Sequence, residues 1–158
     1  MTNDEARWTA VRYHLRKGNF TATQNFLGGP DEFDRQVVEW LANGRFDGEE
    51  EILAEAFACA CMLGRVSTAR HLLDNGVDPY SGMSTGLAGP HYAVGGGHIE
   101  LLEMLLAHNI PLEVENQYGG TLLGQALWSA VNEPKPGHAE VIAALVDAGA
   151  VVEPGTLE

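Results

Sequence analysis

The sequence predicts an all-α solenoid, in which short helix pairs repeat along the chain and stack in order. Three stretches of similar sequence begin at Gly64, Gly97 and Gly137, so their spacings are 33 and 40 residues. Each stretch has apolar residues at helical spacing and ends twelve positions later at Gly or Asn, which suit the left-handed position that closes a helix. Glycine is also abundant, at 19 of 158 residues, which is typical of a chain with many reversals.

The composition describes one globular domain with an acidic surface. The chain is 45% hydrophobic and 20% charged, and its length is sufficient to bury a core. A net charge of −13 argues against nucleic acid and anionic membranes as ligands, because both require a basic surface. It suits either a basic protein partner or simple solubility. Residues 1–70 carry a net charge of −3, whereas residues 71–158 carry −10 with Lys135 as their single basic residue.

The two cysteines and the hydropathy of the chain favour a reducing compartment. Cys59 and Cys61 are separated by one residue, a spacing that strains a disulfide between them. The first residues contain no apolar run of the signal-peptide type, and no stretch approaches the 18 apolar residues of a membrane span. We therefore expect a monomeric, cytoplasmic protein without membrane attachment.

Residues 1–48 are predicted to form a divergent helical capping region. Thr2 begins a capping-box pattern, which predicts a helix that ends at about Lys17. Residues 20–29 are a candidate for the outer partner of that helix, and residues 30–44 indicate an additional helix. Because an end repeat must present one face to water, this region is expected to depart from the regular pattern.

Residues 49–158 are predicted to contain about three repeats, each with an inner and an outer helix. A small residue recurs in the inner helices at Ala60, Ala93 and Ala126, where it allows close packing of neighbouring helices. The last repeat carries an inserted loop near 129–138, which contains two prolines and is therefore not a longer helix. The expected helix pairs are 50–63 with 66–75, 90–96 with 98–108, and 121–131 with 138–148.

The repeats share a sequence motif at fixed positions. In the second repeat it comprises Gly86, His91, Ala93, Gly97, His98, Glu100, Leu101 and Leu102. In the third it comprises Gly119, Thr121, Ala126, Gly137, His138, Glu140, Val141 and Ile142. The first keeps Phe57, Ala60, Gly64, Leu72, Leu73 and Gly76. This motif and its period of 33 residues resemble the ankyrin repeat family over about residues 49–152, although the family's Pro-Leu pair is Gly89-Pro90 and Leu122-Leu123 here.

The resemblance implies non-enzymatic protein–protein binding through a concave face, without a cofactor. In that family the turn tips and the variable inner-helix positions form this face. The matching partner-binding residues are Met83, Leu87, Tyr92, Tyr118, Gln125 and Trp128, with an acidic rim of Asp78, Glu113 and Glu115. Tyr and Trp are typical of binding hot spots. Alternatively, Tyr92 and Trp128 cover the hydrophobic core or pack under the inserted loop.

Catalytic and metal chemistry are not indicated by any motif. Cys59 and Cys61 lack the spacing of a zinc site with His71, and side chains two positions apart on a helix diverge. The histidines of the motif occupy positions that make structural hydrogen bonds in the family. We therefore expect no catalytic residue, no metal site and no nucleic-acid ligand. A second hypothesis, an acidic immunity or antitoxin-like inhibitor of a basic toxin or nuclease, rests on charge alone.

Overall fold

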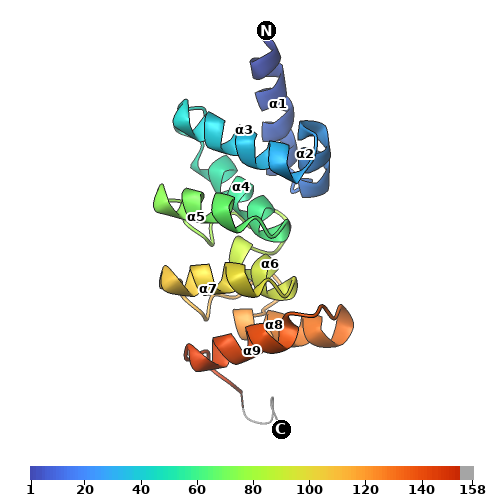
Figure 1. Cartoon of the computed structure of the whole chain (residues 1–158), viewed down its shortest axis with the longest axis vertical. Helices are drawn as coiled ribbons and strands as arrows, with labels where there is room; N and C mark the ends of the chain where they lie inside the picture. The colour runs from blue at the N-terminus through green and yellow to red at the C-terminus, as the bar shows by residue number, and fades with distance from the viewer. Residues whose placement is uncertain (154–158) are drawn as a thin grey trace.

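A computed structural model describes residues 1–153, and over this part the chain is helical and has no strand. The helices are α1 (Asn3–Arg16), α2 (Phe20–Leu27), α3 (Pro30–Ala42), α4 (Glu50–Met62), α5 (Val66–Asp74), α6 (Gly89–Gly95), α7 (Ile99–Ala107), α8 (Leu122–Asn132) and α9 (His138–Asp147). They stack along the long axis of the molecule, from α1 at one end to α9 at the other (Figure 1). The predicted all-α solenoid is confirmed. The last five residues of the predicted repeat region, 154–158, lie outside the described residues.

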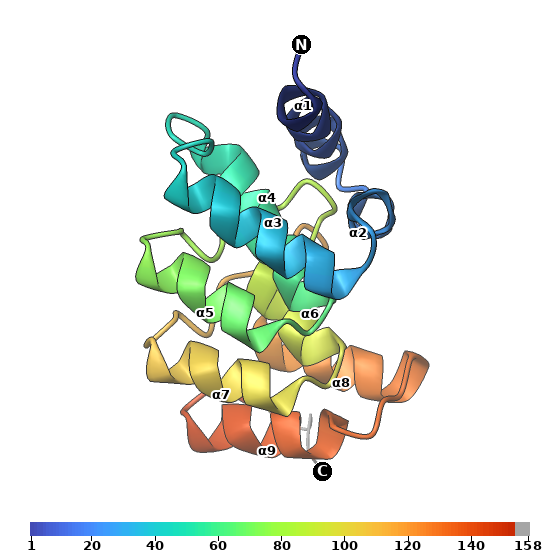
Figure 2. The ribbon, with the colours of Figure 1, turned by 45° about the horizontal axis from the view of Figure 1, so that its top comes forward.

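The helices form two stacked rows (Figure 2). The inner row consists of α1, α4, α6 and α8, and the outer row consists of α3, α5, α7 and α9, with each helix packed on its neighbour in the row. The three predicted helix pairs are α4 with α5, α6 with α7, and α8 with α9, all within one or two residues of the expected bounds. No helix in the described residues is long and apolar enough to cross a membrane.

In the N-terminal segment the helix of the outer row is α3, so the assignment of residues 20–29 to that role is wrong. Helix α3 packs against α5 in the outer row, whereas α2 contacts α1 and α3 in the connection between them. The reason lies in the length and pattern of the two helices. The 13-residue α3 buries a continuous face that includes Phe33, Val37 and Trp40, while the 8-residue α2 buries only Phe20, Thr23 and Leu27.

Each outer helix of the repeats ends at a residue in the left-handed conformation, as predicted. The φ angles are 91° at Gly76, 55° at Asn109 and 98° at Gly149. Gly and Asn tolerate this region of backbone space better than other residues do. At these residues the chain reverses toward the next inner helix. With a period of 33 residues, each helix pair then packs on the pair before it.

The core lies between the two rows, and in the repeats its members include alanines of the inner helices and leucines of the outer helices. Ala60, Ala93 and Ala126 are fully buried. Leu102 and Leu105 of α7 are also fully buried. The inner helices approach so closely that a Cβ atom at Gly89 would lie 2.5 Å from the Phe57 ring. Both cysteines of α4 are buried in this core as free thiols, and burial raises their pKa values.

Candidate functional site

The exposed side of the inner row is the candidate binding surface, and we define it as the inner surface: α6, α8 and the loops 81–88 and 114–121 that precede them. The expected partner-binding residues of these elements are not equally exposed. Tyr118 and Trp128 are 79% and 54% exposed, whereas Met83, Leu87 and Tyr92 are half-buried. Exposed aromatic area is therefore concentrated in the third repeat.

Tyr92 is held in place by the loop and helix on either side of it. Its hydroxyl donates a hydrogen bond to Thr85 Oγ1 at 2.6 Å. Its ring meets the Phe20 ring edge-on, with 5.9 Å between the centroids. Burial raises the pKa of the Tyr92 hydroxyl, so it remains a neutral donor. These contacts agree with the alternative that Tyr92 covers the core, and they leave only part of it for a partner.

Glu55 of α4 is a buried carboxylate that fixes the loop 81–88. One of its oxygens accepts from the Ser84 amide at 3.0 Å and the other from the Ser84 hydroxyl at 2.7 Å. Burial raises the pKa of Glu55 because desolvation disfavours its charged form. Glu55 could not be identified from the sequence, since an isolated Glu inside a helix carries no signal that it will reach a loop 29 positions away.

A chain of hydrogen bonds connects the loop 114–121 to α8. Asn116 accepts from the Tyr118 amide at 2.8 Å and donates to Gln125 at 3.0 Å, and Gln125 donates to Ser129 at 3.0 Å. The Tyr118 ring lies against Gly86 of the preceding loop, where a Cβ atom would be 2.8 Å from it. Gln125 is thus a supporting residue of the surface, and it holds the backbone that presents Tyr118.

Trp128 and Val131 form an exposed apolar pair on α8. They are three positions apart, which places them on one face of the helix, and Val131 is 81% exposed. Because over half of the Trp128 side chain is accessible, the irregular segment 133–137 does not cover it. Val131 was not among the expected binding residues, although its helical spacing from Trp128 is visible in the sequence.

Helix α2 covers the inner side of the first repeat. The Cys59 thiol of α4 donates a weak hydrogen bond to the Phe20 carbonyl, with 3.9 Å between sulfur and oxygen. Gly18, just before α2, lies so close to the loop 81–88 that a Cβ atom would be 2.6 Å from Thr85. Among the repeats, the accessible part of the inner row therefore begins at α6, so the second and third repeats form the candidate surface.

The expected acidic rim divides into Asp78, which lies in a turn, and Glu113 with Glu115, which lie beside a pocket. Asp78 accepts a hydrogen bond from the Tyr80 amide at 3.0 Å and so shapes its own turn. Glu113 accepts from the Val151 amide at 3.2 Å. Glu113 and exposed Glu115 line a pocket beside α8, and the structure adds Glu153 to them. Glu153 could not be identified from the sequence, because its place depends on the path of the chain after α9.

The histidines of the motif connect neighbouring repeats. His138 bonds through Nε2 to the Gly95 carbonyl at 2.8 Å, and the His98 ring lies against Gly64 one repeat earlier, where a Cβ atom would be 2.9 Å from it. His91 accepts from the Ala88 amide through Nδ1, which leaves its Nε2 hydrogen to donate to the Val114 carbonyl at 3.0 Å. Within residues 1–153, no three histidine, cysteine or acidic side chains are grouped so that they hold a metal ion.

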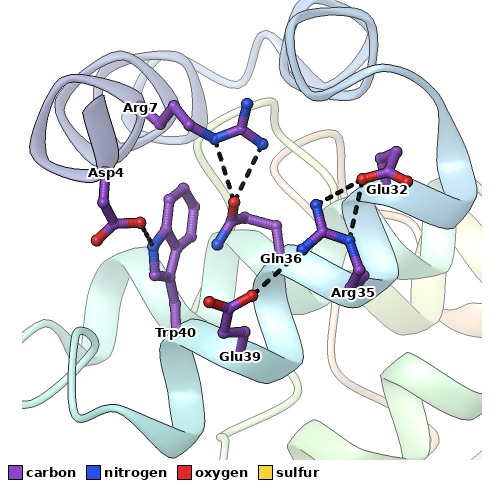
Figure 3. A network of polar contacts seen from close by, with 7 residues as sticks. All are labelled: Asp4, Arg7, Glu32, Arg35, Gln36, Glu39 and Trp40. Carbon is purple, nitrogen blue, oxygen red and sulfur yellow. Dashed lines mark hydrogen bonds and ion pairs between the residues drawn. The ribbon is translucent and has the colours of Figure 1, made fainter.

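Arginines of the N-terminal segment (residues 1–48) form bonds that tie its helices together (Figure 3). Arg7 donates twice to Gln36 Oε1, at 3.2 and 3.0 Å, and joins α1 to α3. Asp4 accepts from the Trp40 indole at 2.9 Å and pairs with Arg45. Hydrogen bonds from Trp40 and then Arg45 lower the pKa of Asp4. Arg7 and Arg45 are therefore engaged in contacts within the N-terminal segment.

The comparison with protein families agrees with this geometry. The family model described as ankyrin repeats (3 copies) matches residues 57–154, which is more than half of the chain. The match begins within α4 and spans the three helix pairs α4–α5, α6–α7 and α8–α9. A search of curated proteins found no match to the chain.

Proposed function

The chain belongs to the ankyrin-repeat family, and we propose that it binds a basic partner protein through the inner surface of its second and third repeats, without catalysing a reaction. Ankyrin repeats are protein–protein interaction modules, and solenoids of this kind bind on extended concave surfaces. One observation carries the proposal: Tyr118 and Trp128 are exposed, although aromatic side chains of this size are costly to leave in water.

The charge distribution supports a basic partner. Residues 71–158 carry a net charge of −10, and Lys135 is their single basic residue. A cationic protein would be attracted over about 8–10 Å at physiological salt, which accelerates association more than it strengthens the final complex. Inhibition of a basic toxin or nuclease is the narrower form of this function. We propose a cytoplasmic monomer, since both cysteines are free and buried.

Alanine substitution of the exposed aromatics tests the proposal. After affinity capture from the native extract at low and high salt, Tyr118→Ala and Trp128→Ala should each weaken binding by about 2 kcal/mol or more, mainly through faster dissociation. Tyr13→Ala is the matched control, because Tyr13 is 57% exposed on α1 and lies outside the inner surface. Wild-type affinity in both test variants, with a loss in the Tyr13 variant, would place the interface on the N-terminal segment.

A further inference from the structure

A pocket with an apolar floor and an acidic rim lies at the exposed end of the third repeat. Its volume is about 230 Å³. The apolar part is formed by Leu123, Leu127 and Val151, and the acidic part by Glu113, Glu115 and Glu153. None of the three carboxylates is in an ion pair with another residue of the described part of the chain.

The pocket exists because the third repeat lacks a side chain that the second repeat has. His91 and Gly124 are both the third residue of their inner helices, α6 and α8. His91 reaches across to the Val114 carbonyl of the next loop and fills the space beside its helix. Gly124 has no side chain to do so, and Thr121 caps the helix instead by accepting from the Gly124 amide at 3.2 Å.

The size and chemistry of the pocket select one kind of ligand. Its volume is below the roughly 300–1,000 Å³ of small-molecule sites, so it suits a single side chain of a larger partner. The acidic groups are not grouped as metal ligands within residues 1–153. A long cationic side chain matches both parts of the pocket, because its methylene stem packs on leucine while its charged end reaches carboxylates.

We propose that this pocket binds an arginine side chain of the basic partner. Arginine is the better match than lysine, because its planar guanidinium presents several donors at once to separate carboxylate oxygens. The inference rests on the proposed function for its choice of a protein ligand.

A peptide titration followed by amide NMR of the isotope-labelled full chain tests this binding. The probe is acetyl-Ala-Arg-Ala-amide, and its partner probe carries citrulline, the neutral isostere, in place of arginine. The amides of Gly119, Gly120 and Gly124 lie at the pocket and should shift saturably with the arginine peptide only. Equal shifts with citrulline, or no shift of these amides, would overturn the proposal.

Two sets of variants locate the binding. Glu115→Gln with Glu153→Gln should weaken the arginine peptide about tenfold, because charge-assisted hydrogen bonds are lost. Glu133→Gln with Glu140→Gln removes the same charge from exposed positions outside the pocket and should leave the affinity unchanged. Equal weakening in both pairs would mean that the peptide responds only to net charge, and would refute a specific pocket.

Filling the pocket gives an independent readout. Gly124→Leu should abolish the shifts at Gly119 and Gly120, and the fold should survive, because a Cβ atom at position 124 meets only Thr121 Oγ1, at 3.4 Å. Unchanged binding in this variant would contradict the proposal. The result is separable from the proposed function, since the experiment uses no partner protein: failure here leaves the Tyr118 and Trp128 test intact, and the converse also holds.

Discussion

The N-terminal segment and the last two repeats are both built of stacked helix pairs, but different interactions hold them together. In the N-terminal segment, arginine bonds connect the helices, and Trp8 meets the rings of Trp40 and Phe46 edge-on at 5.3 and 5.2 Å. In the repeats, histidines such as His91 and His138 bond to backbone carbonyls of a neighbouring repeat. Glycines there allow close contact between the inner helices.

The difference follows from the number of neighbours that each unit must accept. A central repeat packs against a similar unit on both sides, so its contact residues recur at the same positions and generate the 33-residue period. The N-terminal segment has one neighbouring repeat, and its contacts need to match only that one. Its arginines pair mainly with acidic groups of the same segment, as Arg45 does with Asp4, and Arg12 pairs with Glu49, the residue before α4, at 2.9 Å. The repeats retain an unbalanced negative charge.

Truncation of a core side chain should have the largest effect in either region. Trp40→Ala should lower the free energy of unfolding by about 3–5 kcal/mol, and Leu105→Ala by about 2–5 kcal/mol, because both residues are buried. Since solenoid stability is a sum of unit and interface terms, Trp40→Ala should unfold the N-terminal segment before the repeats. Urea unfolding in a Trp128→Phe background checks this, because the remaining fluorescence then comes from Trp8 in that segment.

Two probes of urea unfolding, measured on the same variant, test this prediction. Fluorescence from Trp8 and helix content from circular dichroism should give separate midpoints in Trp40→Ala. A single shared midpoint would show that the N-terminal segment and the repeats unfold as one unit. Glu103→Gln on the exposed side of α7 is the control and should change stability by no more than about 0.5 kcal/mol.

Loss of a histidine connection should destabilise the repeats by a smaller amount. His91→Ala leaves the Ala88 amide and the Val114 carbonyl without their side-chain partner, which should cost about 1–3 kcal/mol. His108 bonds to Asp74 at 3.0 Å on the outer row, where both groups are exposed, so His108→Ala should cost less than about 1 kcal/mol. Chemical denaturation of both variants measures the difference, and equal losses would mean that burial of the connection is unimportant.

The sequence predicted the repeats better than it predicted the N-terminal segment or the pocket. The bounds of the repeat helices were predicted correctly because their signals are local. The apolar pattern lies within each helix, and Gly76, Asn109 and Gly149 follow directly after the outer helices. The sequence did not show that α3, and not α2, lies in the outer row. Both segments are amphipathic, and only packing against α5 distinguishes them. The pocket at Gly124 was also hidden, since the missing side chain matters only where the chain after α9 passes beside it.

Mild acid should weaken the repeats before the N-terminal segment. Burial lowers the pKa values of His91 and His98, so the stability they contribute is lost as pH falls below the ordinary value of 6.5. The pKa of Asp4 is lowered by its bond from Trp40, so its contribution persists until pH falls below 3.8. Two groups of the repeats oppose the change: the pKa of exposed His108 is raised by its bond to Asp74, and the pKa of Glu55 is raised by burial. Urea unfolding midpoints at pH 7 and pH 5.5 show which region loses stability first. Loss of Trp8 packing in the N-terminal segment before the repeats weaken would contradict the prediction.

A small effect on stability should come from the arginine that joins the N-terminal segment to the first repeat. Arg65, which precedes α5, donates to Asp31 at 2.6 Å and to Asp34 at 2.8 Å, both on α3. Arg65→Ala should cost about 1 kcal/mol, near the upper limit for exposed pairs, because one guanidinium satisfies two carboxylates of another helix. Arg35→Ala is the control: Arg35 pairs within α3 with acidic residues three and four positions away and should matter less. At 1 M salt the Debye length is about 3 Å, so screening should make the stability losses of Arg65→Ala and Arg35→Ala equal. A difference that persists in high salt would show that Arg65 acts by packing its methylene stem, and the connection between the two regions would then be apolar.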